Sequence, residues 1–155
     1  MQQIKLITAV FVGLLVLSGI TAFPLQTEME FLLTIINWFP MPLRHWIETV
    51  AEGIMQTWSR YPYIAYGTDW LAFAHIMIGL AFVGIWRNPV QNIWICEWAM
   101  LCCLCVFPLA FICGPIRGIP FFHQLIDCSF GIFGLVPLYI LRKKILQLKS
   151  IIKND

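Results

Sequence analysis

The chain has 155 residues, of which 60% are hydrophobic and only 12% are charged, and its formal net charge is +2. Soluble domains carry roughly 25% charged residues, so the composition excludes an ordinary soluble domain and predicts a membrane protein. The length allows a single domain over residues 1–155. Nothing in the sequence indicates nucleic-acid binding.

The first apolar segment covers residues 4–23 and carries no charge after Lys5. About twenty residues are enough to cross the hydrocarbon core of a bilayer. A secretory signal peptide is the alternative, with its apolar region at residues 6–17 and Ala22 before the cleavage site. Because Ile20 is too large for a good cleavage site, we predict an uncleaved first span.

Residues 24–68 contain too many charged side chains to cross a membrane. Thr27 and Glu30 have the spacing of a capping box, which predicts a short helix from there to about Asn37. A second helix follows Pro42, and its apolar residues recur every three or four positions, which is typical of an amphipathic helix at a membrane interface. These apolar residues are Leu43, Trp46, Ile47, Val50, Ile54 and Trp58.

Three further apolar segments each have the length of a membrane span, and a polar turn at residues 87–92 separates the first two. Pro108 and Pro137 lie inside two of them, and membrane helices tolerate such prolines where neighbours satisfy the backbone. A basic tail follows at residues 142–155. The predicted spans are residues 70–86, 93–113 and 120–141.

The distribution of basic residues predicts the orientation. Four spans place both termini on one side, together with Lys5, Arg87, Arg142, Lys143, Lys144, Lys149 and Lys153, whereas Arg44, Arg60 and Arg117 lie on the other. By the positive-inside rule the termini are cytoplasmic, in the inner membrane if the source is bacterial. We therefore expect an all-α integral membrane protein, a four-transmembrane-helix bundle with an outward-facing, interfacial amphipathic helical segment between the first two spans.

Five ionisable side chains fall in the outer third of this predicted membrane protein. Asp127 follows Pro120 by seven residues and lies about 10 Å further along the helix axis, a depth at which a carboxylate needs a partner. His123 lies four residues before it, on the same face of a helix. The five candidate site residues are Asp69, His75, Arg117, His123 and Asp127.

Carboxylate and imidazole groups beside an arginine suit proton transfer next to a bound anion. The sequence thus predicts an outer-leaflet polar site that binds or processes a small anionic or lipid-like molecule. In this interpretation His75, His123 and Asp127 transfer protons, while Arg117 and Asp69 hold the substrate. Whether the protein is an enzyme, a transporter or a structural subunit stays open.

Two alternatives use the same residues. His75 and His123 lie on different spans at similar depth and are candidate axial ligands of a haem; with Asp127 they are candidate ligands of a metal ion. The second alternative is a structural subunit of a larger membrane complex, whose polar groups pair with each other or with partner subunits. Asp69 is then the N-cap of the second span, and His75 is a core histidine bonded to a neighbouring helix.

The six cysteines contain no C-x-x-C motif, so a thioredoxin-like or zinc-ribbon protein is not expected. Cys113 and Cys128 both fall on the outer side, and a disulfide between them stays open. Glu97 lies near the cytoplasmic end of the third span, where we expect it to extend toward Arg87 or the basic residues 142–144. Three glycines are expected to allow close helix contacts: Gly79, Gly131 and Gly134.

Overall fold

A computed structural model describes residues 1–154, which are helical almost throughout and include no strand. Four helical stretches in this range are long and apolar enough to cross a membrane, and they are Gln2–Ile20, Pro62–Arg87, Ile93–Ile116 and Phe121–Lys153. The predicted all-α fold with four candidate spans is therefore confirmed. The chain forms two compact units, one of residues 14–79 and one that joins residues 1–13 to the chain from Leu80 onward.

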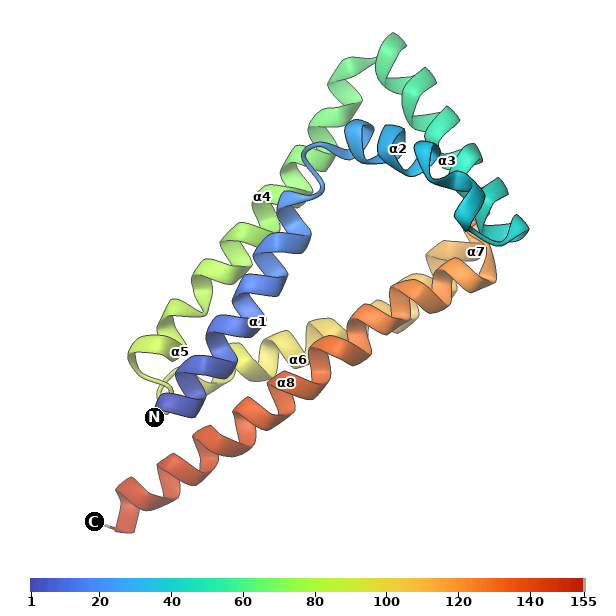
Figure 1. The fold of residues 1–155 in the computed structure, drawn as a ribbon. Helices are drawn as coiled ribbons and strands as arrows, with labels where there is room; N and C mark the ends of the chain where they lie inside the picture. The colour runs from blue at the N-terminus through green and yellow to red at the C-terminus, as the bar shows by residue number, and fades with distance from the viewer. Residues whose placement is uncertain (155) are drawn as a thin grey trace. The chain divides into compact units, whose positions relative to one another are not determined.

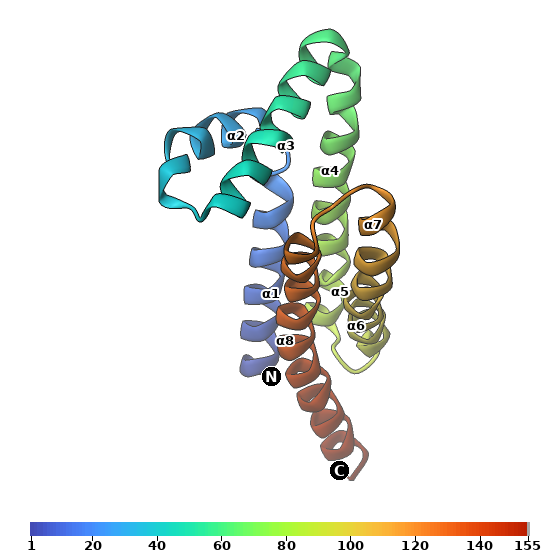
Figure 2. The ribbon, with the colours of Figure 1, turned by 90° about the vertical axis from the view of Figure 1, so that its right-hand side faces the viewer.

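The larger unit is built around two long helices that run in opposite directions. It contains the first part of α1 (Gln2–Ile20), α5 (Val83–Arg87), α6 (Ile93–Pro108), the π-helical turn η3 (Leu109–Cys113), α7 (Gly114–Ile116) and α8 (Phe121–Asn154). Both ribbon views place α6 and α8 side by side (Figures 1 and 2).

The middle of the α6–α8 contact depends on two glycines, as the sequence predicted. A Cβ atom on Gly131 would lie 2.7 Å from the backbone oxygen of Cys103, and one on Gly134 would lie 2.7 Å from the Cys103 Sγ. Real carbon–oxygen contacts of this kind are about 3.3 Å or longer. The two helices therefore approach to a distance that only glycine allows at these positions, which is the usual role of small residues between membrane helices.

Polar contacts hold the same two helices together nearer the start of α6. The Cys96 thiol donates to the backbone oxygen of Leu138 at 3.2 Å, and both residues are fully buried. One residue further along α6, the Glu97 carboxylate accepts a hydrogen bond from Arg142 Nε at 2.8 Å. The expectation that Glu97 extends toward the basic residues 142–144 is confirmed, and Arg142 is its partner.

The two interior prolines have different effects. Pro108 has no N–H to donate to the preceding turn, and the helix continues beyond it as the π-helical turn η3 before α7. Local π-helical geometry is a common way to absorb an irregularity within a helix. Pro137 lies inside α8, which continues as one α-helix from Phe121 to Asn154.

The polar turn between α5 and α6 is closed by asparagine side chains, as its composition indicated. Asn92 Nδ2 donates to the backbone oxygens of Gly84 and Asn88, at 3.0 and 2.9 Å. Asn88 in turn accepts a hydrogen bond from the Gln91 N–H at 3.3 Å. The same two carbonyl oxygens also accept backbone bonds from Asn88 N–H and Asn92 N–H, at 2.9 and 3.2 Å, so the asparagine side chain reinforces the turn.

The second unit contains the end of α1, the two α-helices that follow it, and most of the second candidate span. After α1 come α2 (Leu25–Thr34), the 3₁₀ turn η1 (Ile36–Trp38), α3 (Met41–Arg60), the 3₁₀ turn η2 (Pro62–Ala65) and α4 (Tyr66–Ala81). The expected amphipathic helix is present as α3. Its start is held by Arg44, whose Nη2 donates to the backbone oxygen of Asn37 at 3.2 Å.

Two predicted helix starts were wrong. Pro24 occupies the N-cap of α2 without a side-chain cap, so Thr27 lies inside the helix and Glu30 accepts from Gln26 instead. The second candidate span was expected to start at residue 70 with Asp69 as its N-cap, but α4 begins at Tyr66 and η2 precedes it.

Candidate functional site

The connection between α7 and α8 is a compact loop that carries Arg117. Gly118 has φ +70°, in the left-handed region that glycine adopts without strain. The Gly118 N–H donates to Pro115 O at 3.1 Å, and the Ile119 N–H donates to Gly114 O at 2.9 Å. This pair of bonds defines a Schellman motif, which places Arg117 at the C-cap of α7 with an exposed side chain.

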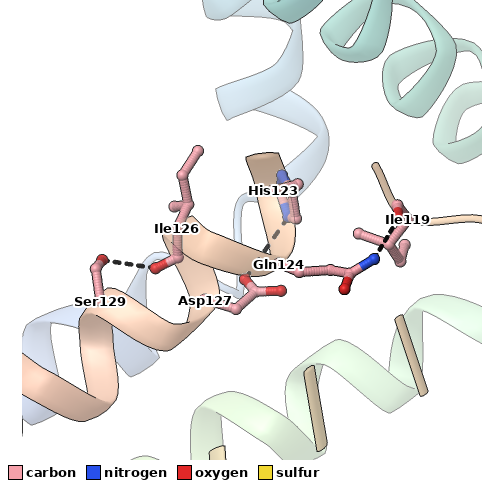
Figure 3. A network of polar contacts seen from close by, with 6 residues as sticks. All are labelled: Ile119, His123, Gln124, Ile126, Asp127 and Ser129. Atoms are coloured by element: carbon pink, nitrogen blue, oxygen red, sulfur yellow. Dashed lines mark hydrogen bonds and ion pairs between the residues drawn. The ribbon is translucent and has the colours of Figure 1, made fainter. Parts of the chain in front are cut away.

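Gln124 joins this loop to the first turns of α8. Its Nε2 donates to the backbone oxygen of Ile119 at 2.7 Å, and the residue is only 5% exposed. Its side chain also packs on Gly114, where an added Cβ would lie 2.8 Å from the Gln124 Cγ. The loop that presents Arg117 is therefore fixed against α8 by one buried polar side chain, drawn in Figure 3.

His123 and Asp127 form the charged part of the site on α8. His123 Nε2 lies 3.7 Å from Asp127 Oδ1, and the two side chains are 37% and 43% exposed. Figure 3 shows the contact along the helix, beside Gln124. The four-residue spacing predicted that the two side chains share one face of the helix. The partner of Asp127 in the structure is His123.

The distance between His123 and Asp127 suits a contact between charges. A separation of 3.7 Å exceeds the usual length of a hydrogen bond, so the pair interacts through charge when the imidazole is protonated. Both side chains are partly exposed. Asp127 supplies a hydrogen-bond acceptor, and Arg117 in the preceding loop supplies a positive charge.

The other two candidate residues belong to the second unit. Asp69 lies in the first turn of α4, where a carboxylate interacts favourably with the helix dipole, so its interpretation as an N-cap was wrong. His75 Nδ1 lies 2.8 Å from the backbone oxygen of Leu71, and its Cβ packs against Gly19 of α1. The side chain is therefore held by its own helix and by close contact with α1, not by a bond to a neighbouring helix.

The haem site and the metal site proposed from the sequence would each need His75 of one unit and His123 of the other. Both sites stay predictions. Across residues 1–154, no three His, Cys, Asp or Glu side chains gather as ligands for a metal ion. All six cysteines are free, including Cys113 and Cys128. The structure brings His123 and Asp127 together on α8, and Arg117 lies in the loop that precedes this helix.

Comparison with known proteins adds no family. A scan against protein-family models, a search of curated proteins and a search of solved structures each returned no match. A functional hypothesis for this chain therefore depends on its own residues and their geometry.

Gln124 is the residue at this site that sequence reasoning missed. From the sequence alone, a glutamine in the first turns of a predicted span is expected to be an ordinary polar residue near the membrane surface. Its packing partner, Gly114, lies in α7, and its acceptor, Ile119, lies in the loop between α7 and α8. A glycine before the loop and a glutamine after it are the only sign of this contact in the sequence.

Proposed function

We propose that this chain is a four-span membrane protein with cytoplasmic termini, and that its outer face binds a lipid headgroup or another small phosphate-bearing anion. The four apolar helices and the excess of basic residues beside the termini support this orientation. The amphipathic α3 then lies at the outer interface, where Trp38, 88% exposed, and Tyr63, 72% exposed, suit the headgroup level.

The observation that carries the binding function is the His123–Asp127 pair beside the fixed Arg117 loop. The guanidinium group of Arg117 is suited to a phosphate oxygen. The carboxylate of Asp127 repels a bare anion and accepts a hydrogen bond from a hydroxyl group. The site is therefore complementary to a ligand that carries both a negative phosphate and a hydroxyl donor, as the headgroup of phosphatidylglycerol does.

The test is the affinity of the reconstituted protein for phosphatidylglycerol, measured by native mass spectrometry against a phosphatidylcholine background. We expect Arg117→Gln to lower this affinity about tenfold, because a hydrogen bond to a charged group contributes about 1.5–3 kcal/mol. Arg60→Gln is the matched control, since Arg60 is also exposed and outward in this topology but lies over the ring of Tyr61 in the other unit.

A parallel titration with inorganic phosphate and glycerol phosphate distinguishes the two sources of the anion. Binding of the soluble anions that is lost in Arg117→Gln identifies a site for free phosphates. Binding of the lipid alone identifies a headgroup site. Equal affinities of the wild-type protein, Arg117→Gln and Arg60→Gln for every probe would contradict the proposed function.

A further inference from the structure

The C-terminal end of α8 continues past the start of α6, the helix on which α8 packs. Contacts along α8 run from Gln124 with Gly114 of α7, through Gly131 with Cys103 of α6, to Arg142 with Glu97 of α6. This antiparallel register places Ile93, the first residue of α6, level with Lys144. The residues of α8 after Ile145 therefore extend beyond α6 by about 14 Å, at 1.5 Å per residue, and Figure 2 shows this projecting end.

The face of α8 that packs on α6 has a strict spacing of three and four residues that continues into the projecting end. From Gly131 onward its members are Gly131, Gly134, Leu138, Leu141, Ile145, Leu148 and Ile152. Leu138, Leu141 and Ile145 are fully buried, whereas Leu148 is half-buried and Ile152 is 60% exposed. The apolar stripe is thus continuous with an existing helix–helix interface, and its last two members extend past the cover that α6 provides.

The charges beside the stripe repeat with the same period. Such flanking positions of a heptad pattern set the choice of partner in helix pairs. Arg142 flanks Leu141 and pairs with Glu97 of α6 at 2.8 Å. Lys149 occupies the equivalent position one heptad later, beside Leu148, and has no acidic partner among residues 1–154. A basic residue at the position that pairs with Glu97 in α6 therefore occurs again at Lys149, beyond the start of α6.

We propose that the projecting end of α8, residues 145–153, docks an acidic amphipathic helix of a different protein, which continues the α6 side of this interface. The partner covers Leu148 and Ile152 with apolar side chains and places carboxylates opposite Lys144 and Lys149. In the topology proposed above this contact lies on the cytoplasmic side. It rests on that topology and not on the Arg117 site at the opposite end of α8.

A second copy of this chain fits the surface less well. Copies inserted in the same orientation would pair their projecting ends in parallel, and that arrangement places Lys144 of one copy against Lys149 of the other. Two like charges would then face each other on each side of the apolar stripe, with no acidic side chain nearby in the described part of the helix to neutralise them.

An anionic membrane surface is also less favoured. A helix must lie in the plane of the interface to bury an apolar stripe in lipid, whereas α8 continues without a break from Phe121 through the basic residues to Asn154. Lys149 lies seven residues past Arg142, about 10 Å further along the axis. The stripe at Leu148 and Ile152 therefore points along the side of a helix that leads away from the bilayer.

The experiment uses the full chain in phosphatidylcholine nanodiscs and two fluorescent three-heptad peptides. Both peptides carry leucine and isoleucine at the apolar positions; one carries glutamate at the flanking positions and the other lysine. Binding is measured by fluorescence anisotropy. We expect the acidic peptide to bind and the basic peptide not to bind.

Charge-reversal variants test the geometry. The double variant Lys144→Glu/Lys149→Glu is expected to weaken binding of the acidic peptide at least about fivefold, since flanking pairs change from attraction to repulsion, and to gain binding of the basic peptide. The control Lys143→Glu/Lys153→Glu makes the same change in net charge on the outward face and is expected to have little effect. Leu148→Ser/Ile152→Ser is expected to abolish binding.

Four results would overturn the proposal. One is the absence of acidic-peptide binding to the wild-type protein, and another is equal loss in the two charge-reversal variants, which would indicate a non-specific basic surface. The third is cross-linking of two copies through a cysteine placed at Leu148. The fourth is protection of the projecting end from hydrogen exchange in phosphatidylglycerol nanodiscs without peptide, which would identify lipid as the occupant.

Discussion

Replacing Gly131 by alanine tests the close α6–α8 contact most sharply. The new Cβ would lie 2.7 Å from the backbone oxygen of Cys103, so the two helices must separate by about 0.6 Å to restore an ordinary contact near 3.3 Å. Overpacking of this size costs about 1–3 kcal/mol. Alanine is also favoured over glycine inside a helix by about 1 kcal/mol, which offsets part of that cost.

Gly13→Ala is the matched control, because Gly13 lies inside α1 with no atom within 4 Å of its added Cβ. This variant receives the helix-propensity gain alone and is expected to be neutral or more stable. The difference between Gly131→Ala and Gly13→Ala therefore isolates the clash, about 1–3 kcal/mol. The assay is unfolding in mixed detergent–SDS micelles, followed by fluorescence of the seven tryptophans.

A second pair of variants distinguishes side-chain from backbone crowding. Gly134→Ala meets the Cys103 Sγ, so Cys103→Ala should relieve its cost, whereas Gly131→Ala meets a backbone oxygen and should gain no such relief. Equal free energies of unfolding for Gly131→Ala and Gly13→Ala would refute the close packing of α6 on α8.

Three further predictions concern the polar contacts of α8. Glu97→Arg and Arg142→Glu should each lower the unfolding free energy by about 1 kcal/mol or less, because the pair is partly exposed, and the double swap should restore it; a double variant no more stable than the single ones would contradict the pairing. Gln124→Leu leaves the Ile119 oxygen without its partner and should cost about 1–3 kcal/mol in the same assay, whereas an unchanged midpoint would show that the loop does not depend on this bond. Asp127→Asn should reduce the ratio of the affinities for phosphatidylglycerol and phosphatidic acid, measured by native mass spectrometry. The reason is that the carboxylate is proposed to accept a hydrogen bond from the glycerol hydroxyl group. An unchanged ratio would show that Asp127 is not part of the site.

The number and positions of the long helices could be predicted because they depend on local composition. An apolar run of about twenty residues identifies a candidate span without knowledge of its neighbours. Helix ends were less predictable, since Pro24 begins α2 before the apparent capping box and α4 starts at Tyr66, ahead of Asp69. At α2 the N-cap is Pro24, which offers no side-chain cap, and at α4 the chain is already helical in η2 before Asp69.

In the candidate site and around α8, contacts within one helix could be predicted from the sequence, whereas contacts between elements could be predicted only in part. The contact of His123 with Asp127 lies within one helix, and its four-residue spacing was enough to predict it. The partner of Glu97 could be narrowed to the basic residues near one end, but the choice of Arg142 depends on the register of α6 against α8. The bond from Gln124 to Ile119 depends on how a loop folds back, which spacing alone does not predict.

The central claim is that the Arg117 loop and the projecting end of α8 lie on opposite sides of a membrane, with the loop outside. The most direct measurement is labelling by a membrane-impermeant maleimide in a variant without the six native cysteines, carrying a single cysteine at Arg117 or at Lys149. We expect position 117 to be labelled in intact cells and position 149 to be labelled only after permeabilisation. Labelling of position 149 in intact cells, with position 117 protected, would contradict the topology and the outward site together.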